Sequence, residues 1–317
     1  VGGGVDSRTI NGFSPLLFAA QQGNIDIARM LLSAGADVNE SAPDGIGGDT
    51  NTQELFRQDT SASALMVAID SGHSAMARFL IERGADVNDS GAGRTPLHSA
   101  TQQEMPAVVR ALLSAGADPN VRLERRLPLL SRAITQDNGL TPSIIGATPF
   151  LLAASYGDVE TMQILIDAGA DPFMMTEDGT TGLMLAAGTD YVDGQDKYGH
   201  RSYPAFLETL QRRAFEATKY CLELGLNINA VNDSGLTALF GAVYMGGTLI
   251  GPYLVQRGAA IDVINLRGQT PWMVAAKGEY RSGSFYTHEE TAEVLEKFGA
   301  DTTLGSDLGR DFRQLLE

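Results

Sequence analysis

The chain has few of the residues and motifs from which a catalytic or metal-binding site can be recognised in a sequence. Its 317 residues include one cysteine, Cys221, and four histidines. A single cysteine excludes an intrachain disulfide and leaves the redox compartment open, because a chain of this length can bury a sufficient core without one. No histidine pair has the spacing of a helical metal site, and no cysteine–histidine cluster is present. A Gly-x-Ser-x-Gly turn and a Lys-Ser/Thr phosphate loop are also missing. We therefore assign no catalytic residue, no metal site and no cofactor.

Long apolar runs and positive charge are also scarce. No stretch of about 18 apolar residues exists, so we expect no membrane-spanning helix. The 23 Lys and Arg residues face 39 Asp and Glu residues, a formal net charge of −16. An acidic excess opposes binding to phosphate backbones and anionic lipid surfaces. We therefore expect no nucleic-acid partner.

Two short motifs recur along the chain and are its main signal. The first is Gly-Ala-Asp-x-Asn, which begins at Gly35, Gly84 and Gly116 and, in weaker form, at Gly169, Gly225, Gly258 and Gly299. The second is Thr-Pro-Leu or a relative of it, at 14–16, 63–65, 95–97, 148–150, 181–183, 237–239 and 270–272. In five units the proline position precedes the motif glycine by 20 residues. A fixed offset in successive copies indicates a repeat architecture.

Each residue type in the motifs has a physical reason. Thr or Ser caps the first helix, and Pro fits its first turn because no backbone N–H is needed there. Small Ala pairs allow close helix approach, apolar pairs such as Leu31-Leu32 give the second helix a buried face, and the motif glycine suits a left-handed helix end. No unit buries its apolar face alone, so the units are expected to stack in one dimension.

Seven copies in phase resemble ankyrin repeats, and the degenerate pattern is similar to multi-repeat ankyrin proteins of environmental bacteria. The resemblance implies an all-α solenoid of about seven helix-turn-helix repeats with hairpin-like fingers, in a single domain over residues 1–317. The repeats are placed at 9–39, 60–88, 90–120, 143–171, 176–229, 232–262 and 265–301, and a half-repeat cap at 305–317. It also implies a bacterial source and favours a periplasmic or secreted location, with a cytoplasmic one as the alternative. The start at Val1, without Met, is interpreted as a processed or truncated terminus whose targeting segment lay upstream.

Four long insertions interrupt the pattern. Those at 42–60 and 121–145 lie on the finger side, and those at 190–211 and 279–286 lie between the two helices of one repeat. Insertions in solenoids map to loops on one face, often the binding face. The alternative is neutral drift, because long surface insertions cost little closure entropy.

The candidate partner-binding residues are mainly aromatic. In the ankyrin pattern the two positions after the Ala pair face the concave groove, which points to Tyr156, Tyr244 and Met245. Two insertions add Tyr191, Tyr198, Tyr203, Phe206, Tyr280, Phe285 and Tyr286, and the finger-side insertion adds Arg122, Arg125 and Arg126. Aromatic residues and Arg dominate binding hot spots. The alternatives are that the aromatics only pack the insertions and that the arginines form local salt bridges.

The leading hypothesis is a non-catalytic protein–protein interaction scaffold that binds a partner protein through the concave groove and the inserted loops. The partner is expected to present a basic or neutral face. The first alternative is an ankyrin subunit or regulatory domain of a larger enzyme complex. The second is a small-molecule binder or enzyme that uses an aromatic pocket of Tyr191, Tyr198, Tyr244 and Tyr286, with His200 or His288.

Overall fold

A computed structural model describes residues 4–5, 7–9, 12–42, 61–124, 144–189, 204–246, 248–278 and 287–305. Fourteen α-helices lie in these ranges, where pairing between extended segments is limited to one isolated bridge, Ser41 with Ser63. The predicted all-α architecture is therefore confirmed for the part of the chain that the structure describes. The cap predicted at 305–317 lies, apart from Gly305, outside the described residues.

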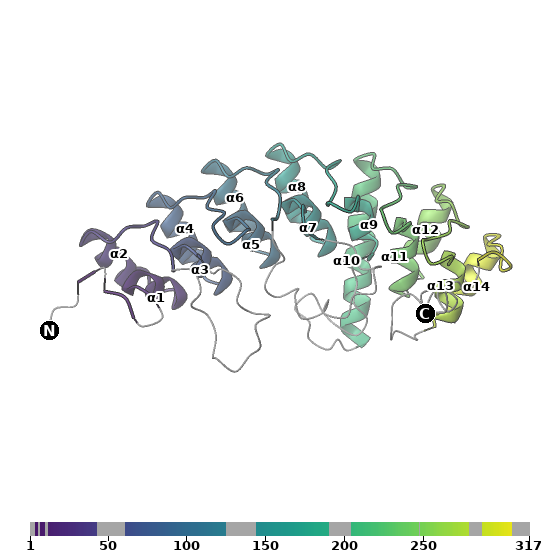
Figure 1. The fold of residues 1–317 in the computed structure, drawn as a ribbon, viewed down its shortest axis with the longest axis horizontal. Coiled ribbons are helices and arrows are strands. Elements are labelled where there is room, and N and C mark those ends of the chain that lie inside the picture. The colour runs from purple at the N-terminus through teal and green to yellow at the C-terminus, as the bar shows by residue number, and fades with distance from the viewer. Residues whose placement is uncertain are drawn as a thin grey trace, which may run out of the picture. The chain divides into compact units, whose positions relative to one another are not determined.

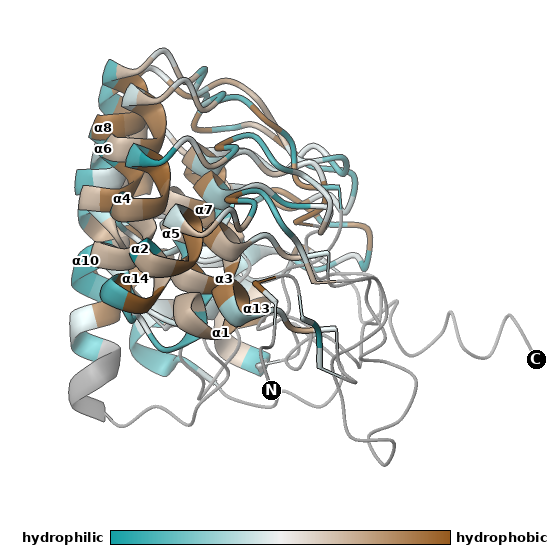
Figure 2. Cartoon of the chain, turned by 90° about the vertical axis from the view of Figure 1, so that its left-hand side faces the viewer, coloured by the Kyte–Doolittle hydropathy of each residue, from teal (hydrophilic) through white to brown (hydrophobic). Residues whose placement is uncertain are grey.

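The helices follow one another in seven pairs (Figure 1). The first four pairs are α1 (Pro15–Gln21) with α2 (Ile25–Ser33), α3 (Ala64–Asp70) with α4 (Ser74–Glu82), α5 (Pro96–Gln102) with α6 (Pro106–Ser114), and α7 (Pro149–Ser155) with α8 (Val159–Asp167). The last three are α9 (Gly182–Ala186) with α10 (Pro204–Glu223), α11 (Ala238–Tyr244) with α12 (Ile250–Gln256), and α13 (Pro271–Lys277) with α14 (Glu289–Lys297). Apolar residues gather along the helices (Figure 2), where the buried side chains of the core lie.

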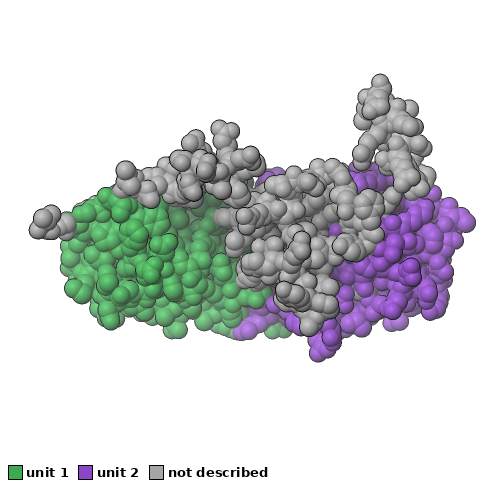
Figure 3. Space-filling view, turned by 90° about the horizontal axis from the view of Figure 1, so that it is seen from below, with its two compact units in different colours: residues 1–125, 163–170 green, residues 126–162, 171–317 purple. Residues whose placement is uncertain are grey.

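The chain divides into two compact units (Figure 3). Residues 1–125 and 163–170 form the first, and residues 126–162 and 171–317 form the second, so the division passes through α8. In the first unit α1, α3 and α5 pack in succession and α2, α4 and α6 form a second layer. In the second unit the order is α7, α9, α11 and α13, with α10, α12 and α14 beside them.

The helix ends form as the motifs predict. Ser or Thr precedes every first helix of a pair, and five of these hydroxyls accept a hydrogen bond from the backbone N–H three residues later: Ser14, Ser63, Thr148, Thr181 and Thr270. The seven motif glycines have φ between 84° and 98°, the left-handed conformation that ends the second helix.

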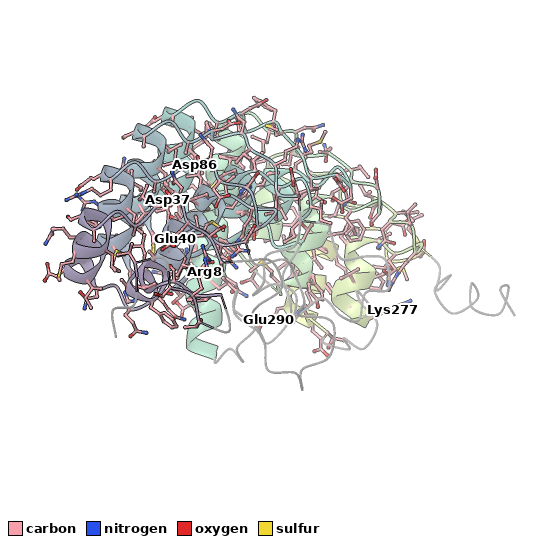
Figure 4. All side chains as sticks on the ribbon, turned by 60° about the vertical axis from the view of Figure 1, so that its left-hand side comes forward. Arg8, Asp37, Glu40, Asp86, Lys277 and Glu290 are labelled. Carbon is pink, nitrogen blue, oxygen red and sulfur yellow. The ribbon has the colours of Figure 1, made fainter. Side chains whose placement is uncertain are left out.

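The segment before α1 is fixed by polar contacts in the first unit. Arg8 Nη1 donates to the carbonyl oxygens of Gly12 and Ser41, each at 2.9 Å. Its Nη2 lies 3.9 Å from Glu40 Oε2, and the two side chains point toward each other (Figure 4). Glu40 also accepts a hydrogen bond from the Ser14 hydroxyl. The first helix therefore begins at a network that includes its own capping residue.

The asparagine of the motif joins neighbouring repeats. Asn88 Nδ2 donates to the Gly116 carbonyl at 3.0 Å, and its Oδ1 accepts from the Asp118 amide at 3.0 Å. We call this pair of contacts the asparagine bridge. Asn229 makes the same bridge to the Gly258 carbonyl and the Ala260 amide. Phe173 occupies the equivalent position after α8, and its side chain has no polar atom that could form the asparagine bridge.

Close backbone contact joins α9 to α11. A Cβ on Gly241 would lie 2.5 Å from the backbone nitrogen of Thr189 and 2.8 Å from the carbonyl carbon of Gly188. Only glycine permits α11 to approach the end of α9 in this way. Gly251 on α12 is the contrasting case, because a Cβ there would meet nothing nearer than Leu239 Cδ1 at 4.0 Å.

Replacing these two glycines with alanine should have opposite effects. Gly241→Ala should lower the free energy of unfolding by about 1–3 kcal/mol, because backbone atoms must move to admit the methyl group. Gly251→Ala should raise it by about 0.5–1 kcal/mol, because alanine is the better helix former. Urea unfolding of both variants checks this, and equal effects of the two substitutions would contradict the close α9–α11 contact.

Candidate functional site

Helix α10 is the main departure from regularity in the described residues. It has 20 residues, whereas α2, α4, α6, α8 and α14 have nine each. At 1.5 Å per residue the difference is roughly 16 Å of additional helix. In Figure 1 its first turns extend past the ends of α9 and α11. Residues 204–211, which the sequence analysis assigned to an insertion, therefore form the first two turns of this helix.

The burial pattern explains why the first turns project. Ala214, Ala217, Thr218 and Cys221 are buried, and their spacing of three and four residues gives one apolar stripe. The stripe begins at Ala214, and the residues from 208 to 213 are half-buried or exposed. Packing therefore holds the second half of α10 on the core, while the first half extends beyond it.

Two neighbours fix the first half of α10. A Cβ on Gly157, just after α7, would lie 2.9 Å from the carbonyl carbon of Arg213, so the end of α7 lies against this helix. On the other side, Gln211 Nε2 donates to the Met245 carbonyl at 3.2 Å, which attaches the end of α11. The ends of α7 and α11, where the sequence analysis placed Tyr156 and Met245, therefore both lie against α10.

The three side chains predicted at these ends are buried. Tyr156 is 4% exposed, Tyr244 6% and Met245 7%. The Tyr244 carbonyl is bonded at 3.0 Å to the Nε2 of His288, the residue before α14. Met245 lies over Gly188, where an added Cβ would be 2.1 Å from its Sδ. These side chains pack the ends of the inner helices, and a contact between them and a partner stays a prediction.

Most of the other predicted site residues lie outside the described residues. They are Tyr191, Tyr198, Tyr203, Tyr280, Phe285, Tyr286, Arg125 and Arg126, together with the side chain of Phe206. His200 also lies outside them. The aromatic pocket proposed from sequence therefore stays a prediction.

Arg122 lies on an exposed finger position in the first unit. It lines a depression of about 240 Å³ together with Asn88, Ser90, Gly93, Arg94, Thr95, Asp118, Val121 and Glu124. Arg94 in this lining is paired with Asp70 at 2.7 Å. Because the lining carries both signs of charge, it does not indicate a ligand of one charge.

The described histidines hold backbone in place. His98 is buried, and its Nδ1 accepts a hydrogen bond from the Thr95 amide at 3.2 Å. Nε2 of His73 lies 2.9 Å from the Gln21 carbonyl, which repeats the contact of His288 with Tyr244 in another pair of repeats. Within the described ranges, no three His, Cys, Asp or Glu side chains are grouped to hold a metal ion. The helices described there are also too short or too polar to cross a bilayer.

Comparison with known proteins agrees with the helix pairs and their motifs. A model of the ankyrin repeat matches residues 11–42 and 145–177, and a model of three ankyrin repeat copies matches 46–122. The chain is built of ankyrin repeats. The crystal structure of the human ASB11 ankyrin repeat domain superposes with a TM-score of 0.62 at 21% identity, over 92% of this chain and 100% of that one. That similarity shows the fold.

Curated relatives share only part of their length with this ankyrin array. Human B-cell lymphoma 3 protein is 28% identical over 193 residues, which cover 57% of this chain and 39% of the relative. The E3 ubiquitin-protein ligase XBAT32 of Arabidopsis thaliana is 34% identical over 191 residues, which cover 56% of this chain and 34% of the relative. The match therefore spans about two fifths or less of these relatives.

The sequence analysis did not examine which residues occupy the finger tips. In the second unit the fingers carry the exposed apolar residues Phe173, Met175, Val231, Ile264 and Leu266. The signal was present in the repeat alignment, because the position six residues after the motif glycine changes from polar to apolar between the third and fourth repeats.

Cys221 should be unreactive in the folded array. It is buried in the stripe of α10, and burial raises the pKa of its thiol from 9.0 to about 12. Near pH 8 we expect a disulfide reagent to label the folded chain only as fast as it unfolds, and to label the denatured chain at once. Because the folded form keeps the proton, this thiol lowers stability as the pH rises from 9 toward 12. Rapid labelling of the native protein would contradict its burial.

Proposed function

We propose that this ankyrin array is a non-catalytic protein–protein interaction scaffold. Ankyrin repeats generally mediate protein–protein interaction, and the chain has them over most of its described length. The observation that carries the proposal is the projection of α10, a feature that the other described helices do not share. We place the partner-binding face of the second unit at the first turns of α10, and the inserted loops at 42–60, 121–145, 190–211 and 279–286 stay the binding segments predicted from sequence.

The contacts of α10 suit it to binding. The projecting turns are attached to the core through Gln211 and the close approach of Gly157 to Arg213, so they are ordered before a partner arrives. A preformed surface avoids the entropy cost of ordering on association. Glu208 and Arg212 form an exposed ion pair at 3.3 Å, and such pairs are easily exchanged for contacts with a partner.

The charge of the chain favours a partner with a basic or neutral face. A net charge of −16 attracts cationic surfaces, and the association should weaken as salt is added. The bacterial source and the periplasmic or secreted location are not supported further by the relatives, which come from mouse, human and Arabidopsis thaliana. They stay predictions.

A second candidate function is that of a subunit or regulatory domain of a larger enzyme. It is favoured by the similarity to XBAT32, whose name gives it a ligase activity while the match spans only 34% of its length. In that case catalytic residues would lie in other chain segments or subunits. Stable co-purification with one enzyme would favour this candidate over a free-standing scaffold.

A substitution on α10 tests the proposed face. Glu208→Ala with Arg212→Ala should weaken binding of a partner captured by the intact chain by about tenfold or more, a loss of about 1.4 kcal/mol. The matched control is Glu216→Ala with Lys219→Ala, which removes a second ion pair, at 2.9 Å, from the same helix, with Glu216 exposed and Lys219 half-buried. The control should change the affinity by less than about twofold, because this pair lies on the half of α10 that packs on the core and surface pairs contribute little to folding.

The partner is found first by capture from extract with mass spectrometry, using the intact chain and a form that lacks residues 193–203. The affinities are then measured by calorimetry, and thermal unfolding confirms that each variant is folded. If both double variants bind the partner as the intact chain does, the face is not on α10. If the folded chain captures no specific protein, the scaffold function itself is wrong.

A further inference from the structure

Three successive fingers of the second unit present an apolar side chain at the same position. Met175, Val231 and Ile264 each follow their motif glycine by six residues and are 46%, 54% and 50% exposed. The equivalent residues of the first unit are polar: Ser41, Ser90 and Arg122. We call the residues Met175, Val231 and Ile264 the finger row. The first unit forms its fingers with polar residues at this position, so the fold does not require an apolar one. A run of exposed aliphatic residues limited to one unit therefore needs an explanation other than folding.

Each member of the finger row is held outward by the residue that follows it. Thr176, Asn232 and Asn265 are buried and tie their own hairpins. Asn232 Oδ1, for example, accepts from the amides of Ser234 and Leu236, both at 3.0 Å. Successive residues of an extended segment point to opposite sides. Burial of one residue therefore directs the preceding aliphatic side chain to solvent.

Backbone hydrogen bonds fix the fingers to one another. The Asp233 amide donates to the Asp178 carbonyl at 2.9 Å, and the Leu266 amide donates to the Ser234 carbonyl at 3.2 Å. Neighbouring fingers belong to packed helix pairs, whose axes lie about 8–10 Å apart. The finger row is therefore an ordered line with a step of about 10 Å.

Acidic side chains lie beside the finger row. Two residues beyond its members are Glu177, Asp233 and Leu266, all exposed, with Leu266 at 77%. The same three fingers carry five acidic residues in all, Asp171, Glu177, Asp178, Asp233 and Asp262, against one basic residue, Arg267. The surface thus combines an apolar line with a negative margin. It matches a partner that is apolar along one stripe and cationic beside it.

We propose that the finger row docks a basic amphipathic α-helix of a partner protein. This inference rests on the proposed scaffold function and names a second surface and its partner chemistry. A helix rises 1.5 Å per residue, so side chains seven apart lie on one face about 10.5 Å apart, which matches the step between fingers. An extended strand matches poorly. Two of its residues that are about 10 Å apart are separated by three positions in sequence, so their side chains point to opposite faces.

Synthetic peptides test the proposal without knowledge of the natural partner. The probe is a helical peptide of about 21 residues with Leu at the a and d positions of each heptad and Lys on the remaining face. A scrambled peptide of the same composition and a peptide with Glu in place of Lys serve as comparisons. Fluorescence anisotropy should show that the patterned basic peptide binds at least about tenfold more tightly than either.

Two variants of the chain locate the binding. Val231→Asp and Ile264→Asp should each weaken binding of the basic peptide by about tenfold or more. The control is Met30→Asp, since Met30 is a 72% exposed apolar residue on α2 of the first unit and is not part of a finger. It should leave the affinity unchanged. Because all three side chains are exposed, unfolding temperatures should stay close to that of the parent chain.

Several outcomes would overturn the proposal. Equal binding of the scrambled peptide shows charge attraction without recognition of the stripe, and equal loss with Met30→Asp shows nonspecific adhesion. A dimer in light scattering that Val231→Asp abolishes assigns the row to a second copy of the chain. If the peptides fail while a partner captured through α10 is still bound, the finger-row inference falls and the scaffold function stands.

Discussion

The array depends on contact between neighbouring repeats, because no repeat could persist by itself. Its inner helices have five or seven residues, and isolated helices shorter than about 12–15 residues are marginal in water. Each helix pair buries its apolar face against the next pair along the chain. The asparagine bridge satisfies polar groups at the end of one repeat with those of the following repeat. Contacts such as Gly241 with Gly188 let the inner helices approach closely enough to exclude water. The stability of the fold therefore comes mainly from contacts between neighbouring repeats, as expected for a one-dimensional array.

This arrangement separates what must be constant from what can vary. Small inner-helix residues serve packing between repeats, capping residues begin the inner helices, and the motif glycines supply the positive φ that ends the outer helices. Positions that point away from the array contribute little to stability and are open to change. The first turns of α10 and the finger row use that freedom in different ways. One extends an existing helix beyond the core, and the other exchanges polar tips for aliphatic ones on an unchanged hairpin.

The fold followed from sequence because its determinants are local. The Ser or Thr before an inner helix accepts a hydrogen bond from the backbone three residues later in five of the seven copies, and the motif glycine adopts positive φ in all seven. The candidate site was harder to predict because it depends on where other elements lie. Tyr156 and Tyr244 occupy positions that face the groove in the family pattern, but here both are buried at helix ends that lie against α10 and its neighbours. The start of α10 at Pro204 was obscured by the surrounding aromatic residues, which resembled an irregular insertion.

The substitution of Phe173 for the bridging asparagine has a mechanical consequence. Asn229 ties the fifth repeat to the sixth with two hydrogen bonds, and Asp262 Oδ1 accepts from the Asp301 amide to link the sixth to the seventh. At the junction after α8, Phe173 supplies no such link, and the fingers there are joined through the Asp233 amide and the Asn232 side chain. Tension between the fourth and fifth repeats is therefore carried at the fingers by hydrogen bonds between the hairpins themselves, whereas between the later repeats the side chain at the bridging position carries part of it.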